Sequence, residues 1–233
     1  IQKTGGCFMS EEIKVGDLKI KPLNKNVKEI HPAIGIVDDI AYTGVWIPCE
    51  ITGPKGKTAF KDLLWLITSK RQQILANDEQ LRNYGWRLSY KPIRFQNRWS
   101  LKGVKTFLSG GIVTPQNVLN HVVSAYKDFI EFTNEKECVY HALWDIGTYF
   151  HHLFNAYPYL YIGGVKRCGK TKTLMLHSCL AHNAFFSNNM STSSIYRLIQ
   201  NARGTLLIDE TEKLSFYKMS ERTLEFRSIL LSG

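Results

Sequence analysis

The sequence predicts a mixed α/β protein: a basic, strand-rich α+β region, then a helical segment, then an α/β sheet with flanking helices. Three observations predict this order. β-prone runs separated by turn signals come first, apolar residues at helical spacing come second, and short apolar runs alternating with helical segments come last. We therefore divide the chain into residues 1–110, 111–157 (a helical linker or subdomain) and 158–233. Because the chain begins without Met and stops at Gly233, we expect a fragment of a longer protein with a truncated C-terminal core.

In the first region, two β-prone runs flank the pair Asp38-Asp39, which predicts two strands around a tight turn. The stretch Gly53-Pro54-Lys55-Gly56 is a second turn signal. The predicted strands cover residues 33–37, 41–51, 63–68 and 85–90.

In the second region, Thr114 is placed to cap a helix that has Pro115 at its first position. Asn134 is placed to cap a second helix, with Glu137 as its capping-box partner, and this helix is predicted to run towards Pro158. Its apolar and aromatic stripe, which we interpret as a packing face, comprises Val139, Leu143, Ile146, Tyr149, Phe150 and Leu153.

The third region alternates strands and helices, which is typical of an α/β sheet. The predicted elements are, in order, a strand at 159–162, a helix at about 170–180, a strand at 184–187, a helix capped by Ser191 or Ser193 and ended by Gly204, a strand at 205–208 and a helix at 221–231.

A glycine-rich loop between the first of these strands and its helix fits the pattern GxxxxGK[ST]. Glycines let the backbone wrap around phosphate oxygens, and the helix N-terminus adds its positive dipole end. Lys170 is predicted to reach the β- and γ-phosphates of ATP, and Thr171 to offer its hydroxyl to Mg²⁺. The C-terminal region is therefore predicted to be a partial P-loop NTPase sheet. The predicted nucleotide-binding residues are Gly164, Val165, Lys166, Arg167, Cys168, Gly169, Lys170, Thr171 and Lys172.

Two carboxylates follow the apolar run at residues 205–208, and the first lies 39 residues after Lys170. This order puts Asp209 and Glu210 at the carboxyl edge of the sheet, beside the phosphate loop, where open α/β sheets bind ligands. Asp209 is predicted to support Mg²⁺, partly through water, as a Walker B acid. Glu210 is predicted to orient and deprotonate the attacking water, so that Lys170 and Glu210 are the predicted catalytic residues.

The net charge of +10 lies mainly upstream of the phosphate loop: residues 1–110 hold 18 Lys/Arg against 10 Asp/Glu, and the rest 12 against 10. Residues 61–110 interleave ten basic residues with aromatic ones. Cations for phosphates and aromatic rings for base stacking predict contact with nucleic acid, most simply single-stranded DNA. Strand-core packing of the aromatics and a solubilising surface remain alternatives.

We find no signal-peptide pattern and no apolar run of the roughly 20 residues that a membrane helix needs. The five cysteines form no CxxC pair, which favours a reduced, cytoplasmic setting without membrane contact.

From residue 140 onward the chain resembles the ATPases of mobile-element and phage-type primase–helicase replication proteins. The strand predicted between the two nucleotide motifs, with an acid after Asp209, resembles AAA+ motors and hexameric helicases. The matching residues are Trp144-Asp145-Ile146-Gly147-Thr148-Tyr149-Phe150, Phe154, Pro158-Tyr159-Leu160, the phosphate loop, residues 191–197, residues 205–210, Glu212-Lys213-Leu214 and residues 227–233.

The resemblance implies an ATP-driven motor on nucleic acid that assembles as a homo-oligomeric ring. Such motors also need a polar sensor and an arginine finger after the Walker B strand, and Gly233 comes only 23 residues after Glu210. We therefore expect this chain to bind nucleotide and to hydrolyse it poorly. The alternatives are a regulatory or defence P-loop switch acting through protein partners, and a small-molecule kinase.

Three other features carry weaker expectations. His141, His151 and His152 do not predict a metal site, because the first and last, if on one helix, lie about 16 Å apart. Cys168 is expected to be a small residue that fits the loop. Arg197 is either an arginine that acts in a neighbouring subunit or a surface charge.

Overall fold

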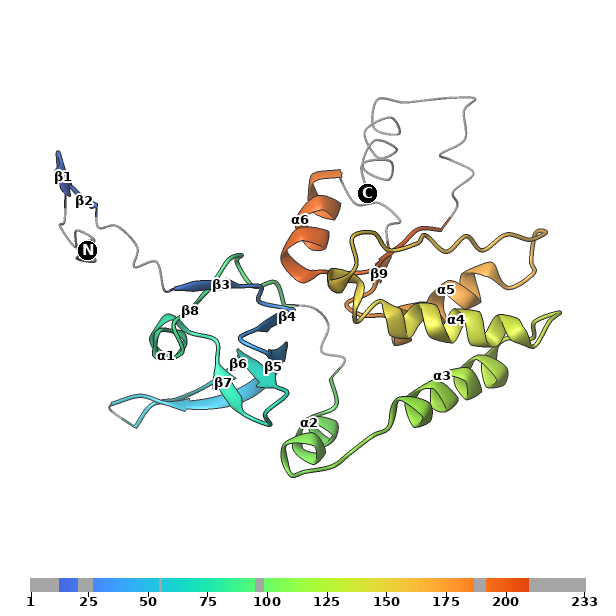
Figure 1. The fold of residues 1–233 in the computed structure, drawn as a ribbon, viewed down its shortest axis with the longest axis horizontal. Helices are drawn as coiled ribbons and strands as arrows, with labels where there is room; N and C mark the ends of the chain where they lie inside the picture. The colour runs from blue at the N-terminus through green and yellow to red at the C-terminus, as the bar shows by residue number, and fades with distance from the viewer. Residues whose placement is uncertain (1–12, 21–26, 55, 95–98, 187–191, 210–233) are drawn as a thin grey trace, which may run out of the picture.

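The computed structural model describes residues 13–20, 27–54, 56–94, 99–186 and 192–209, and shows a mixed α/β chain (Figure 1). Strands β3 to β8 gather in an N-terminal lobe, and helices α3 to α6 in a C-terminal lobe. The strands are β1 (Ile13–Val15), β2 (Leu18–Ile20), β3 (Lys28–Ile30), β4 (Ile34–Val37), β5 (Ile40–Thr52), β6 (Thr58–Thr68), β7 (Gln73–Leu75), β8 (Trp86–Leu88), β9 (Phe185–Phe186) and β10 (Leu206–Leu207). The helices are α1 (Asp78–Asn83), α2 (Leu101–Leu108), α3 (Pro115–Phe129), α4 (Lys136–Gly147), the 3₁₀ turn η1 (His151–Leu153), α5 (Lys170–Leu180) and α6 (Thr192–Ala202).

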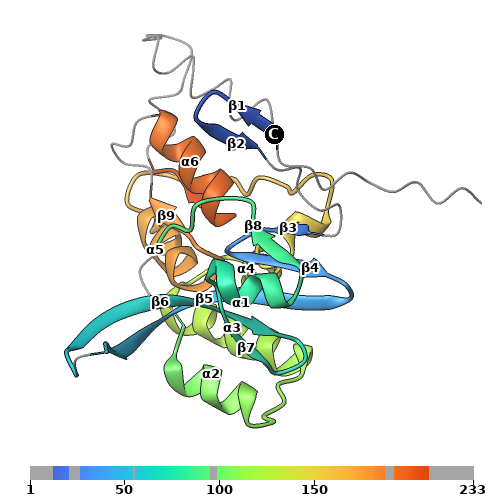
Figure 2. The same ribbon diagram turned by 90° about the vertical axis from the view of Figure 1, so that its left-hand side faces the viewer.

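The N-terminal lobe is built on an antiparallel sheet with the order β4-β5-β6-β7. Both predicted turns are confirmed. Asp38 and Asp39 have φ angles of 50° and 59° and join β4 to β5 with Val37 opposite Ile40, a two-residue hairpin of the kind whose twist suits flanking strands. Around Gly53 the chain turns again, and β5 and β6 form the long hairpin that curves away from the sheet in Figure 2.

The centre of this lobe is one apolar cluster around the fully buried Leu66. Its other buried members come from the β3–β8 parallel pair, from β5, from β7 and from α1: Ile30, Trp86, Tyr42, Ile74 and Leu81. A second cluster joins Val104 of α2 to Val45 and Ile67 of the sheet.

Two helices of this lobe were not predicted. Their N-caps are ordinary polar ones: the Asn77 side chain accepts from the Gln80 amide, and the Ser100 side chain accepts from the Gly103 amide. Helical structure therefore begins before residue 110. Within residues 61–110, Phe107 lies on α2 rather than on a strand.

The helices of the C-terminal lobe confirm one prediction and correct another. The Thr114 side chain caps α3, with Pro115 at its start, as predicted. The Asn134 side chain accepts from the Lys136 amide, the first of α4, at 3.0 Å, but Glu135 is the N-cap and no capping box forms. Helix α4 ends at Gly147. The predicted continuation to residue 153 is wrong because the hydrogen-bond spacing changes after Thr148. The Thr148 amide still bonds to the Trp144 carbonyl, four residues back, whereas the amides of Tyr149 and Phe150 bond to carbonyls only three residues back.

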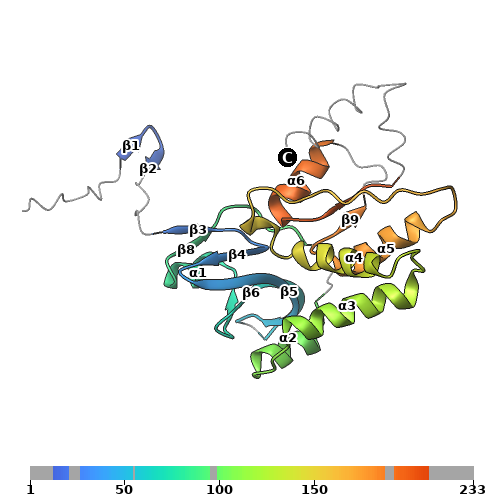
Figure 3. The same ribbon diagram turned by 45° about the vertical axis from the view of Figure 1, so that its right-hand side comes forward.

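The predicted packing stripe of this segment is largely on the outside, with Leu143, Phe150 and Leu153 each about half exposed. Helix α4 instead buries its opposite, more polar face: Cys138, His141, Ala142 and Asp145. These residues pack where α3, α4 and α5 meet, as Figure 3 shows.

Helix α5 has the predicted bounds, and β9 and β10 are paired in parallel as the two later strands of the predicted sheet. The first predicted strand is wrong: residues 156–164 have no regular secondary structure, and Tyr159 and Tyr161 are 70% and 80% exposed. A strand exists only by pairing, and this segment is attached to α4 instead, through the Trp144 Nε1 donor to the Pro158 carbonyl at 2.9 Å.

Helix α6 ends at Ala202, and the left-handed residue that follows is Arg203 (φ 47°) rather than the predicted Gly204. Ser193 lies inside this helix, and Ser191 and the helix predicted at 221–231 fall outside the described residues.

Leu66→Ala should lower the free energy of unfolding by about 2–5 kcal/mol, because it removes a fully buried side chain and leaves a cavity in the sheet. Urea denaturation measures this change. Leu18→Ala is the matched control, since Leu18 is 68% exposed. Equal losses from the two variants would contradict the assignment of Leu66 to the core.

Candidate functional site

The glycine-rich loop curls around the Lys170 side chain at the start of α5. Gly164, Arg167 and Gly169 have φ angles of 156°, 69° and 92°, so the chain reverses several times within six residues. Gly169 is the N-cap of α5 and supplies no side chain to cap it, which leaves the first amides of the helix to an anion. The Lys170 ammonium donates to the carbonyls of Gly164 and Val165, each 2.9 Å away, and so lies inside the loop.

The two predicted Mg²⁺ residues meet in the structure. The Thr171 hydroxyl donates to Asp209 Oδ2 at 3.0 Å, although 38 residues separate the two in the chain. The contact joins the first turn of α5 to the end of β10, as the predicted arrangement requires. Glu210 lies outside the described residues, so its predicted place beside them stays a prediction.

These residues fit a magnesium nucleotide in their chemistry. A hydroxyl and a carboxylate oxygen are the hard ligands that Mg²⁺ prefers, and it keeps several waters beside them. A Cβ added at Gly164 would lie 2.5 Å from Cys168 Sγ, which an exposed side chain can relieve by rotation, so the φ angle of 156° is what favours glycine there. The remaining predicted loop positions, Val165 to Cys168, and Lys172 are exposed, as a site open to a ligand needs.

A buried hydrogen-bond network that the sequence did not reveal lies where α3, α4 and α5 meet. The Tyr126 hydroxyl donates to Asp145 Oδ2 at 2.5 Å, and His177 Nδ1 donates to Asp145 Oδ1 at 2.6 Å. His177 Nε2 lies 2.9 Å from His141 Nδ1. Three of these side chains are at most 1% exposed, and they come from α3, α4 and α5. The sequence pattern that could have indicated this network is the spacing of His141 and Asp145, four residues apart on one predicted helix.

Burial sets the protonation of this network. Desolvation raises the pKa of Asp145, against the opposing hydrogen bonds from His177 and Tyr126. Desolvation also raises the pKa of Tyr126, with the neighbouring Asp145 acting in the same direction. Burial lowers the pKa of His141 to about 4, so this ring is neutral at pH 7 and its Nδ1 proton can be donated to His177.

His141 is therefore a buried structural residue rather than an ordinary helix residue. It does not share a helix with His152, because α4 ends before η1 begins. Among the residues that the structure describes, no group of three or more His, Cys, Asp or Glu side chains is placed to hold a metal ion.

The basic residues of the N-terminal lobe divide into two groups. Arg71 donates to the Phe107 and Gly111 carbonyls, while the exposed Arg87 and Arg94 form surface ion pairs with Glu29 and Asp62, so these three already have partners within the fold. The others in the described part of residues 61–110 are exposed: Lys61, Lys70, Arg82, Lys91, Lys102 and Lys105.

Two of the aromatic residues predicted to contact nucleic acid belong to the interior, namely the buried Trp86 and the half-buried Trp65. The others that the structure describes are more than a third exposed: Tyr84, Tyr90, Trp99 and Phe107. Trp99 and Phe107 line an apolar cleft of about 730 Å³ between the sheet, α2 and η1, and none of its lining residues belongs to the phosphate loop. Arg197 is exposed on α6.

Comparison with known proteins adds no relative: no family model, no curated protein and no solved structure matches the chain. Within the described ranges, no helix combines the length and the apolar character needed to cross a membrane.

Acidification from pH 7 to pH 5 should lower the free energy of unfolding, because burial lowers the pKa of four histidines from 6.5 to about 4: His31, His141, His152 and His182. Such a group stabilises the fold fully above pH 6.5, and this contribution is lost as the pH falls towards 4. His31, His141 and His182 are under 10% exposed. Each of them lowers the free energy of unfolding by at most about 1.4 kcal/mol per pH unit in this range. Asp145 acts in the opposite direction, since its pKa is raised.

Urea denaturation of the wild type and of His182→Gln at several pH values measures this slope. The variant should show a shallower pH dependence, whereas His121→Gln, an exposed change on α3, should keep the wild-type slope. A wild-type stability that is constant between pH 7 and pH 5 would contradict the prediction.

Proposed function

We propose that this protein binds and hydrolyses ATP as a motor acting on nucleic acid, of the helicase type found in replication proteins. The observation that carries the proposal is the 3.0 Å contact between the Thr171 hydroxyl and Asp209. This contact joins the GxxxxGK[ST] loop, through the first turn of α5, to the acid that follows β10. P-loop ATPases combine a phosphate-binding loop with an acid after a strand in this way.

The chain's own residues have distinct parts in this proposal. The amides at the start of α5 bind phosphate oxygens, and the Lys170 ammonium moves from the loop carbonyls to the β- and γ-phosphates. Thr171 and Asp209 hold Mg²⁺, the latter partly through water, and a bound Mg²⁺ supplies charge neutralisation on the phosphate oxygens. Glu210 orients and deprotonates the attacking water.

We infer from the exposed lysine and arginine side chains of the N-terminal lobe that the partner is nucleic acid, most simply single-stranded DNA. Lys102 and Lys105 lie on the same short helix as Phe107, and Trp99 immediately precedes that helix. Phosphate contacts and base stacking can therefore come from one element. A homo-oligomeric ring and a cytoplasmic setting belong to the proposal through the resemblance and the cysteine usage described above.

Thr171→Ala should weaken Mg²⁺-dependent ATP binding by about tenfold, because the metal loses a protein oxygen ligand, a change of about 1.4 kcal/mol. Lys170→Ala should weaken it further, since a full positive charge at the phosphates is removed. Isothermal titration with ATP, with and without Mg²⁺, measures both effects.

Thr171→Ser is the matched control, because it keeps the hydroxyl, and it should bind as the wild type does. Lys127→Ala removes an exposed lysine of α3 that lies outside the loop and should also leave binding unchanged. ATP binding that is unaffected by Lys170→Ala would overturn the proposed site.

Single-stranded DNA should stimulate ATP hydrolysis by the full-length protein, and its binding should weaken steeply with added salt, because each phosphate contact releases counterions. Glu210→Gln should bind ATP normally and lose the stimulated hydrolysis. A phosphate-release assay with fluorescence anisotropy at several salt concentrations measures both. Hydrolysis that ignores DNA and RNA would favour the protein-partner switch, and phosphoryl transfer to a small acceptor would favour a kinase.

A further inference from the structure

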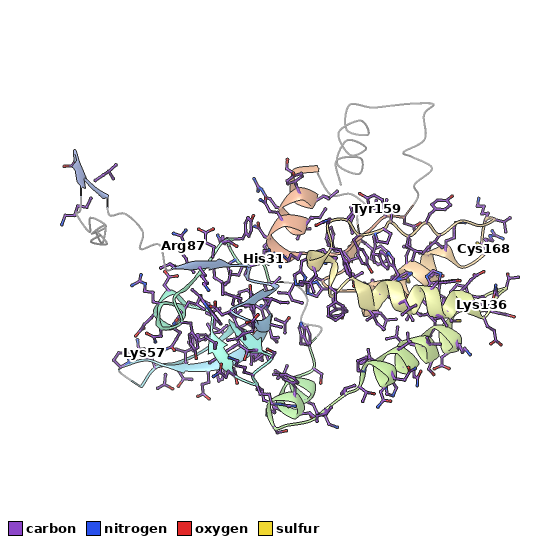
Figure 4. The ribbon with its side chains drawn as sticks, viewed as in Figure 1. His31, Lys57, Arg87, Lys136, Tyr159 and Cys168 are labelled. Carbon is purple, nitrogen blue, oxygen red and sulfur yellow. The ribbon has the colours of Figure 1, made fainter. Side chains whose placement is uncertain are left out.

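A second polar pocket lies at the junction of the two lobes, where β3 and β4 face the end of α6. Its volume is about 370 Å³. Two hydrogen bonds cross the junction beside it: the His31 Nε2–H donates to the Gln200 carbonyl at 2.9 Å, and the Arg203 guanidinium donates to the Ile34 carbonyl at 2.6 Å. Figure 4 labels His31 at this junction, between β3 and the C-terminal lobe.

The charges that line this pocket do not cancel. Lys28 is paired with Asp38, and Glu29, the one acidic residue of the lining, is paired with Arg87. Arg203 forms no ion pair with any carboxylate of the described residues, and burial lowers its pKa. A guanidinium has five N–H donors, so the bond to one carbonyl leaves several of them for a ligand. One half-buried positive charge therefore has no carboxylate partner among the described residues, and a bound anion would compensate it.

His152 supplies a second unused polar group in the same lining. Its Nδ1 is buried and has no hydrogen-bond partner among the described residues. Buried nitrogens without a partner are rare in folded proteins, and each needs an explanation. Both nitrogens of His31, in contrast, are used: Nε2 donates to Gln200, and Nδ1 accepts from the Ala33 amide at 3.1 Å. Arg203 also acts electrostatically on His152, so the two groups are close neighbours.

We propose that this pocket binds a phosphate group, with Arg203 as a forked donor to two of its oxygens and the His152 ring, turned so that one of its nitrogens faces the pocket, as a donor to a third. A planar guanidinium matches the oxygens of a phosphate in this way, and a bound anion would satisfy both unpaired groups at once. The site is separate from the phosphate loop, because no residue of the loop lines it. The phosphate belongs either to a small phosphate compound or to the backbone of a bound nucleic acid.

Arg203 precedes β10, which leads to Asp209. Arg203 thus connects the pocket and the N-terminal lobe to the strand that carries the proposed Mg²⁺ residue.

The test uses the full chain with Lys170→Ala, which removes the proposed phosphate-loop site, and pyrophosphate as the probe. Thermal unfolding at increasing pyrophosphate should still show a rise in Tm in this variant, because a ligand that binds only the folded state stabilises it. Adding Arg203→Gln or His152→Gln should raise the apparent Kd about tenfold or more. Adding Arg203→Lys, which keeps the charge, should restore part of the binding, and adding Lys127→Gln, an exposed change on α3, should have no effect.

Circular dichroism and the Tm without ligand show whether each variant is folded. If the Arg203→Gln variant is unfolded, the His152→Gln variant tests the pocket instead. An apparent Kd that is the same with and without the Arg203 and His152 changes would overturn the proposal, whatever Lys170→Ala does to ATP binding. Fluorescence anisotropy with a single-stranded oligodeoxynucleotide then separates the sources. Loss of oligonucleotide binding in Arg203→Gln, with competition by pyrophosphate, assigns the pocket to a nucleic-acid phosphate. Unchanged oligonucleotide binding assigns it to a small phosphate compound.

Discussion

The C-terminal lobe depends on one buried carboxylate and the groups that satisfy it. Asp145 is 1% exposed and accepts from Tyr126 of α3 and His177 of α5, so three helices meet on its two oxygens. Leaving such a carboxylate without a partner costs several kcal/mol, whereas three helices packed only through apolar side chains could slide or rotate at lower cost. The network therefore fixes the rotation of α5 about its own axis. Since α5 begins at Lys170, that rotation also decides where Lys170 and Thr171 lie.

The strand that leads to Asp209 is fixed in a complementary way, by backbone groups of β9 and of the segment just before it. The Phe185 amide donates to the Thr205 carbonyl at 3.0 Å, and the Thr205 amide donates to the His182 carbonyl at 3.1 Å. Just before Thr205, Arg203 reaches across to the N-terminal lobe. The position of Asp209 thus depends on the α5–β9 connection and on the junction of the lobes, while the position of Thr171 depends on the buried network. Their 3.0 Å contact requires both sets of interactions at once.

Local signals in the sequence predicted the elements whose ends are encoded locally. Examples are the Thr114-Pro115 start of α3, the Asp38-Asp39 turn and the bounds of α5. Each depends on residues within a few positions of one another, so a local sequence pattern is enough to predict it. The glycine-rich loop is also a local pattern, but its nucleotide binding stays a prediction, and the strand predicted before it is not formed by residues 156–164.

What the sequence could not supply is the choice among long-range partners. Tyr126 and His177 are 51 positions apart, and no local pattern pairs them. The buried face of α4 was predicted wrongly for the same reason. Hydrophobic periodicity selects Leu143 and Phe150, but the hydrogen-bonded carboxylate of Asp145 lies on the opposite face, which is the buried one.

Helix α4 contacts the chain on both sides of the phosphate loop, through two adjacent residues. Trp144 donates to the carbonyl of Pro158, before the loop, and Asp145 accepts from His177 on the helix after it. Residues 159–162 form no strand, so no sheet pairing positions the start of the loop. These two contacts instead attach the segments before and after the loop to the same turn of α4, and that turn therefore helps to set the position of the loop.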